Sequence, residues 1–235
     1  MAVFLMGSGS AAHAASKLSG GCRVPEVYLT FEDTLARTEK LVDRSAPVRI
    51  LVVGPDIGGP ALSPKKRSRL EVELARRLPD VTFSIMDAGD TPGLVRDDFE
   101  RIRAAIRQTR PDLVVWQLGT ADALAATNLD EFSRVLGQAA DWLEGRNIDL
   151  ILIDPPFLPS VSHERAYGRI VRQIDAVSDR ERVNVLKQYA ATSYLFTTPP
   201  AASDTDPTSP TSALQSGRLC LPELLAEAIV RAATR

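Results

Sequence analysis

Five short apolar runs alternate with amphipathic stretches along most of the chain, and this alternation limits its fold more than any other feature. The runs are VRILVVG (48–54), VTFSIMDAG (81–89), DLVVWQLG (112–119), IDLILID (148–154) and RVNVLKQ (182–188). Strands that are apolar throughout are typical of a parallel sheet covered by helices on both faces. Because crossovers between parallel strands are right-handed, the pattern predicts a three-layer doubly wound α/β domain with a five-stranded parallel sheet of order 2-1-3-4-5.

The stretches between the runs carry apolar residues at helical spacing, as Leu70, Leu74 and Leu78 do. A lead-in helix is expected over 31–43, before the first strand, and a final helix over 221–234. The segment 197–217 is rich in Pro, Ser and Thr and can bury little apolar surface, so it is predicted to be a long mobile loop. Residues 25–235 are therefore expected to form one domain.

The N-terminal segment differs from the rest in composition. MAVFLMGSGSAAHAASKL has a short apolar run followed by small residues and an Ala12-His13-Ala14 pattern of the kind that signal peptidase accepts. Residues 1–24 are predicted to be signal-peptide-like or disordered. The protein is accordingly expected in the periplasm or outside the cell, with the cytoplasm as the alternative.

The two cysteines, Cys22 and Cys220, match no metal-ligand spacing. They are either inert thiols or, in an exported protein, a bridge between the two ends of the domain.

Charge and hydropathy bear on which partners the chain has. A formal net charge of −2 gives no electrostatic basis for binding nucleic acid or an anionic membrane. No stretch is long and apolar enough to span a bilayer. No cofactor is expected.

In an open parallel sheet, ligands bind beyond the carboxyl ends of the strands. The candidate pocket residues at those ends are Gly54, Asp56, Gly89, Gly119, Asp122 and Asp154, with His163 just after the fourth run. The acidic residues at the strand ends, which include Asp87 or Asp90, have two interpretations. Their oxygens are suited to Mg²⁺ or Ca²⁺, or they cap the following helices and turns. The second interpretation is favoured, so no metal site is predicted.

These strand ends resemble those of the SGNH/GDSL hydrolase superfamily of esterases and lipases. The resemblance covers roughly residues 46–234 and rests on LVVGPDIGG, RLEVELARRLPDVTFSIMDAG, PDLVVWQLGTADAL and ILIDPPFLPSV. It implies a flavodoxin-like sheet. In that family the first strand ends in a serine nucleophile, and a glycine and an asparagine complete the oxyanion hole. An Asp-x-x-His before the last helix supplies the acid and the base.

This sequence carries other residues at the positions that the resemblance aligns with that machinery. Asp56 stands in place of the serine, and Ala121 in place of the asparagine. Pro92, which has no N–H, falls near the oxyanion glycine. Ser216 and Leu219 occupy the places of the acid and the base. The resemblance therefore predicts a non-catalytic protein with a binding or structural role in envelope or exopolysaccharide biology, whose partner is a small molecule, an envelope protein or a polysaccharide.

The alternative is a divergent esterase or O-acyl hydrolase with an atypical catalytic apparatus. The chain has two histidines, His13 and His163. The sequence around His163 predicts a surface histidine in the first turn of a helix, although an open pocket where it approaches a hydroxyl would favour the enzyme. A crevice filled around Leu219 and Ala121 would favour the non-catalytic role, so Leu219 is expected to be buried.

Overall fold

The computed structural model describes residues 18–55, 57, 68–89, 91–159, 161–198 and 210–235, and for 161–164 and 210–218 it describes the backbone only. Within these ranges five strands form one parallel sheet in the order β2-β1-β3-β4-β5, which confirms the predicted fold class and strand order. The strands are β1 (Val48–Val53), β2 (Phe83–Asp87), β3 (Leu113–Gln117), β4 (Asp149–Ile153) and β5 (Asn184–Leu186).

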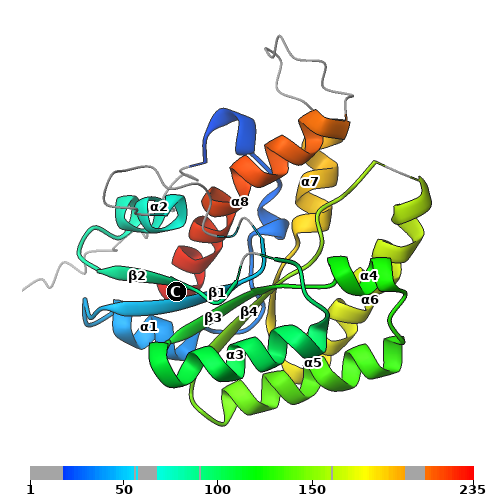
Figure 1. Cartoon of the computed structure of the whole chain (residues 1–235). Coiled ribbons are helices and arrows are strands. Elements are labelled where there is room, and N and C mark those ends of the chain that lie inside the picture. The colour runs from blue at the N-terminus through cyan, green and yellow to red at the C-terminus, as the bar shows by residue number, and fades with distance from the viewer. Residues whose placement is uncertain (1–17, 56, 58–67, 90, 160, 199–209) are drawn as a thin grey trace, which may run out of the picture.

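The helices cover both faces of this sheet. Figure 1 shows α3, α5 and α6 on one side, while α2 and α8 lie on the other. Two 3-10 turns, Gly20–Cys22 and Glu26–Tyr28, precede the first helix. The helices are α1 (Ala36–Val42), α2 (Arg69–Arg77), α3 (Val95–Thr109), α4 (Thr120–Ala125), α5 (Leu129–Glu144), α6 (Val161–Glu181), α7 (Gln188–Thr197) and α8 (Pro210–Ala233).

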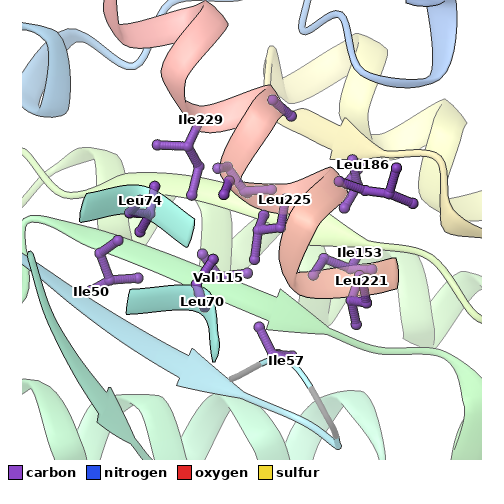
Figure 2. Packing of buried hydrophobic residues seen from close by; sticks show 14 of the residues in the cluster. Ile50, Ile57, Leu70, Leu74, Val115, Ile153, Leu186, Leu221, Leu225 and Ile229 are labelled. Atoms are coloured by element: carbon purple, nitrogen blue, oxygen red, sulfur yellow. The ribbon is translucent and has the colours of Figure 1, made fainter. Parts of the chain in front are cut away.

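The side chains of each strand point alternately into two separate cores. Ile50 of β1 belongs to the core shared with α2 and α8, where it lies among Leu74 and Leu225 (Figure 2). Its neighbour Leu51 belongs to the other core, beneath α3, α5 and α6. Strands buried on both faces leave only the loops at the sheet edges free to form a site.

Polar side chains fix where two of the helices begin. The hydroxyl of Ser68 accepts the backbone N–H of Glu71 at the start of α2. The side chain of Asn128 accepts the N–H groups of Asp130 and Glu131 at the start of α5. Such caps satisfy backbone donors that the first turn of a helix leaves without partners.

The structure differs from the sequence prediction at three elements. The lead-in helix is shorter than 31–43, because Phe31 and Leu35 pack into the core ahead of α1. The helix α7 follows β5 where no helix was predicted. The last helix begins at Pro210, so 210–217 are helical and not part of a loop; residues 199–209 lie outside the described ranges.

A disulfide joins Cys22 to Cys220, with the two Cα atoms 5.3 Å apart. The two cysteines therefore form a bridge in the structure and are not inert thiols. It ties the first 3-10 turn to α8 across 198 residues of sequence. Within the described residues, none of the helices combines the length and the hydropathy needed to cross a membrane.

Candidate functional site

Glycines with left-handed backbone mark the ends of β1, β2 and β3. The φ angles are 116° at Gly54, 134° at Gly89 and 92° at Gly119. The N–H of Gly54 donates to the carbonyl of Gly89 over 3.0 Å, which joins the ends of two adjacent strands. A Cβ atom at Gly119 would lie 2.5 Å from Cγ2 of Ile170, and one at Gly54 would lie 2.7 Å from the carbonyl oxygen of Gln117. The carboxyl edge of the sheet is thus tightly packed at these glycines.

Asp122 lies in the first turn of α4, directly after β3, and its side chain is fully buried. Its carboxylate accepts the backbone N–H of Val95, with N–O distances of 3.1 Å and 3.3 Å. Asp122 therefore caps α3, whose own preceding residue, Leu94, offers no side-chain acceptor. Burial raises the pKa of the Asp122 carboxyl above its usual range, although the Val95 N–H favours the ionised form.

A second buried carboxylate, Asp98 of α3, lies in the same region. The indole N–H of Trp116 donates to Asp98 Oδ2 over 3.1 Å, and Arg101 Nη2 lies 2.6 Å from Asp98 Oδ1. Burial raises the pKa of Asp98, and the negative charge of Asp122 adds to this increase. The sequence does not predict this group, because an aspartate within an amphipathic helix usually faces solvent.

Asp154 follows β4 and is almost completely buried, at 2% exposed. Its Oδ1 accepts the N–H of Tyr189 over 2.8 Å, so Asp154 caps α7. Burial raises the pKa of Asp154 to about 8 and outweighs the backbone N–H groups of Tyr189 and Gln188. Beside it, Gln117 Nε2 donates to Gln188 Oε1 over 2.7 Å, while the buried Gln117 Oε1 has no hydrogen-bond partner among the described residues.

Each acidic residue at a strand end whose side chain is described thus accepts a backbone N–H group. Asp87 Oδ1 accepts the N–H of Gly89 over 2.7 Å and closes a turn, as Asp122 and Asp154 close helix starts. Asp56 and Asp90 lie outside the described residues. Within the described ranges, His, Cys, Asp and Glu form no group of three that could hold a metal ion. These contacts favour the capping interpretation of the acidic residues.

The structure also describes Ala121 and Ser216, which the resemblance aligns with the oxyanion asparagine and the acid, and the candidate pocket residue His163. Ala121 lies in the first turn of α4. His163 lies in the first turn of α6 and Ser216 lies on α8, and for both only the backbone is described.

The structure corrects the prediction for Leu219. The sequence predicts a buried side chain, but the side chain is 51% exposed. The reason is helical geometry, because each residue of α8 is rotated by about 100° from the one before it. Cys220, Leu221 and Leu224 occupy the inner face of α8, and Leu219 is left on the outer face. The crevice is therefore not filled by this leucine.

Comparison with known proteins agrees with this architecture. A model of the non-GDSL lipase-like family matches residues 21–235. No curated protein matches the sequence. Among solved structures, an acetylxylan esterase from Geobacillus stearothermophilus is 19% identical with a TM-score of 0.58, covering 80% of this chain and 94% of its own. A lipase/acylhydrolase from Enterococcus faecalis is 19% identical with a TM-score of 0.58, covering 78% and 96%. The protein TesA is 18% identical with a TM-score of 0.53, covering 79% and 98%. At these identities the likeness establishes the fold.

Proposed function

The chain belongs to the non-GDSL lipase-like family and has the SGNH/GDSL hydrolase fold, and from that premise we propose that it is a non-catalytic member with a binding role. The proposed setting is the cell envelope or exopolysaccharide biology, outside the cytoplasm. The protein would hold a ligand or a partner and carry out no ester hydrolysis.

The observation that carries this proposal is the use made of the carboxylates at the carboxyl edge of the sheet. Asp122 and Asp154 are buried, and each accepts a backbone N–H at the start of a neighbouring helix. A hydrolase of this fold needs a carboxylate that orients an imidazole, and an imidazole that takes the proton of a nucleophile. Asp122 and Asp154 bind helix starts, and the position that the resemblance aligns with the orienting acid is Ser216, which has no carboxylate.

The residues aligned with the remaining machinery support the same proposal. Ala121 has no side-chain donor for a developing oxyanion, and loss of one such donor lowers the rate by about 10²–10³ in other hydrolases. Leu219 has no group that titrates. A carboxylate such as Asp56 is a weak nucleophile toward an ordinary ester and would repel the oxyanion that forms.

The disulfide supports the proposed location. Disulfides persist in oxidising compartments such as the periplasm and are rare in the cytoplasm. Cys22, one end of the bridge, lies within the signal-peptide-like segment 1–24 and after the expected start of the mature chain. N-terminal sequencing of the protein from its native host tests this location: we expect a mature chain that starts near Ala15 or Lys17. Cytosolic protein that starts at Met1 would contradict export.

The proposed lack of a nucleophilic serine is tested by labelling with a fluorophosphonate, which forms a covalent adduct with activated serines. Purified protein would be incubated with an excess of the probe and analysed by intact-mass spectrometry, with an active SGNH esterase treated in parallel. We expect the esterase to gain the mass of the adduct and this protein to keep its own mass. A stoichiometric adduct would overturn the proposal and identify the serine concerned.

A further inference from the structure

A groove lies between α6 and α7, on a surface that the proposed function does not otherwise use. Its cavity volume is about 860 Å³, and its lining consists of Arg165, Gly168, Arg169, Val171, Arg172 and Tyr189. It adjoins the carboxyl edge of the sheet, because the backbone N–H of Tyr189 is the one that Asp154 caps. Along the chain, α6 follows β4 and α7 follows β5.

The groove is positively charged in a protein whose formal net charge is −2. Arg165, Arg169 and Arg172 are exposed, and in the described part of the chain none of them forms an ion pair, unlike Arg180 and Arg182 nearby. Burial raises the pKa of Asp175, the next described carboxylate along α6, and the positive charge of Lys187 opposes this increase. Three guanidinium groups are thus available to an external anion.

The spacing of these arginines indicates an extended ligand. Positions 165, 169 and 172 lie on one face of a helix, and the first and last are separated by about 10 Å along its axis. A row of this length lets one extended ligand contact all three guanidinium groups at once. A chain that carries a charge on successive units can do so, with bidentate hydrogen bonds from guanidinium to carboxylate.

The shape of the groove is suited to a ring-shaped unit. Gly168 lies between the arginines and has no side chain to fill the space, and a Cβ atom there would meet only Arg172 Nη1, at 3.6 Å. Tyr189 lines the opposite wall, and its ring makes an edge-to-face contact with Phe157 at a centroid distance of 5.6 Å. An aromatic ring held in this way offers a flat apolar surface with a hydroxyl at its rim.

We propose that the groove between α6 and α7 binds an anionic oligosaccharide. The arginines hold the carboxylate groups of its acidic sugars, and Tyr189 packs against the face of a sugar ring. This inference rests on the binding role proposed above and names the class of ligand for it. No covalent step is involved.

The test measures binding of hexagalacturonate to the full chain by isothermal titration calorimetry at low ionic strength, with a neutral hexasaccharide, maltohexaose, in parallel. The variant Arg165→Gln/Arg169→Gln/Arg172→Gln removes the charges with side chains that helices accept. A matched control, Arg44→Gln/Arg107→Gln/Arg134→Gln, removes the same number of exposed charges from other surfaces. A third variant, Gly168→Leu, fills the groove and leaves its charge unchanged.

We expect hexagalacturonate to bind and maltohexaose not to bind. The groove triple variant should weaken binding by about tenfold or more, in line with the loss of charge-assisted hydrogen bonds. Gly168→Leu should also weaken it, and the control triple variant should stay within about twofold of the wild type. Binding that the groove variants leave unchanged, or that the control variant weakens equally, would overturn the proposal.

Two further measurements distinguish this proposal from other classes of anionic ligand and from a catalytic role. Tighter binding of a single-stranded oligonucleotide or of phosphatidylglycerol vesicles than of hexagalacturonate would overturn the assignment to a saccharide. Ester turnover in the same preparation would overturn the non-catalytic role while leaving the groove's ligand class intact. Failure of the proposed function and failure of this inference therefore give different results.

Discussion

The carboxylate of Asp122 accepts the backbone N–H of Val95, so that a residue in the first turn of α4, after β3, fixes the start of the helix that follows β2. Asp154 does the same for α7 from the end of β4. Both aspartates stand at the edge where proteins of this fold carry out their chemistry. Their contacts show that this edge is held together by buried carboxylates that bond the backbone.

Replacing Asp122 with alanine should destabilise the fold. The change removes the acceptor of the Val95 N–H and leaves a buried donor without a partner, which costs about 1.5–3 kcal/mol when the acceptor is charged. Urea unfolding followed by circular dichroism measures the effect, with Asp80→Ala, an exposed aspartate, as the matched control. Equal stabilities for the two variants would contradict the capping role.

Stability should depend on pH through Asp154. The pKa of this carboxyl is raised from its ordinary value of 3.8 to about 8 in the fold, so the folded chain holds the proton more tightly than the unfolded chain. The contribution to stability is therefore complete below pH 3.8 and is lost as pH rises through about 8.

The variant Asp154→Asn keeps an oxygen for the Tyr189 N–H and cannot ionise, so it tests this dependence directly. We expect the stability difference, the free energy of unfolding of the variant minus that of the wild type, to increase as the pH of the urea series rises from about 4 to 8. A difference between the two proteins that does not change with pH would contradict the raised pKa.

The glycine at the start of α4 should not tolerate a side chain. Gly119→Ala places a Cβ 2.5 Å from Ile170 Cγ2 on backbone with a φ of 92°, and strain of this kind costs about 1–3 kcal/mol or more. Gly20→Ala is the control, since nothing lies within 4 Å of a Cβ there. Thermal unfolding should show a lower midpoint for Gly119→Ala alone; unchanged midpoints for both would show that the packing around β3 is looser than described.

Removing the disulfide should lower stability by about 2–4 kcal/mol, since the bridge restricts a long loop of the unfolded chain. The double variant Cys22→Ser/Cys220→Ser leaves no unpaired thiol, and chemical denaturation measures its loss. Thiol titration of the unreduced wild type under denaturing conditions should find no free cysteine. Two titratable thiols per chain in protein from the native host would contradict the bridge and weaken the case for export.

The sheet could be predicted from the sequence because its central strands β1, β3 and β4 are largely apolar on both faces. Runs such as VRILVVG and IDLILID have no polar face, and only a sheet covered on both sides buries them completely. The positions of Gly54, Gly89 and Gly119 at one edge follow from the same reasoning, since parallel strands all end on the same side.

What the sequence could not supply were features that depend on tertiary contacts. The sequence of α7 has no amphipathic pattern that would predict a helix. Its start is set by Asp154, whose partner Tyr189 is 35 residues away in sequence. Leu219 was expected to be buried from its alignment with a catalytic histidine, but the rotation of α8 is set by the Cys22–Cys220 bridge and the inner leucines. The pair of amides, Gln117 and Gln188, meets only because β3 and α7 are brought together by the fold.

The central claim is that this protein has the fold of an esterase without its activity, and turnover measures it most directly. Purified protein would be assayed with p-nitrophenyl acetate and with acetylated xylo-oligosaccharides, beside Asp56→Ala and His163→Ala. We predict that release of p-nitrophenol and of acetate stays at the rate of the buffer alone for all three proteins. Turnover above that rate in the wild type, abolished by either substitution, would contradict the account.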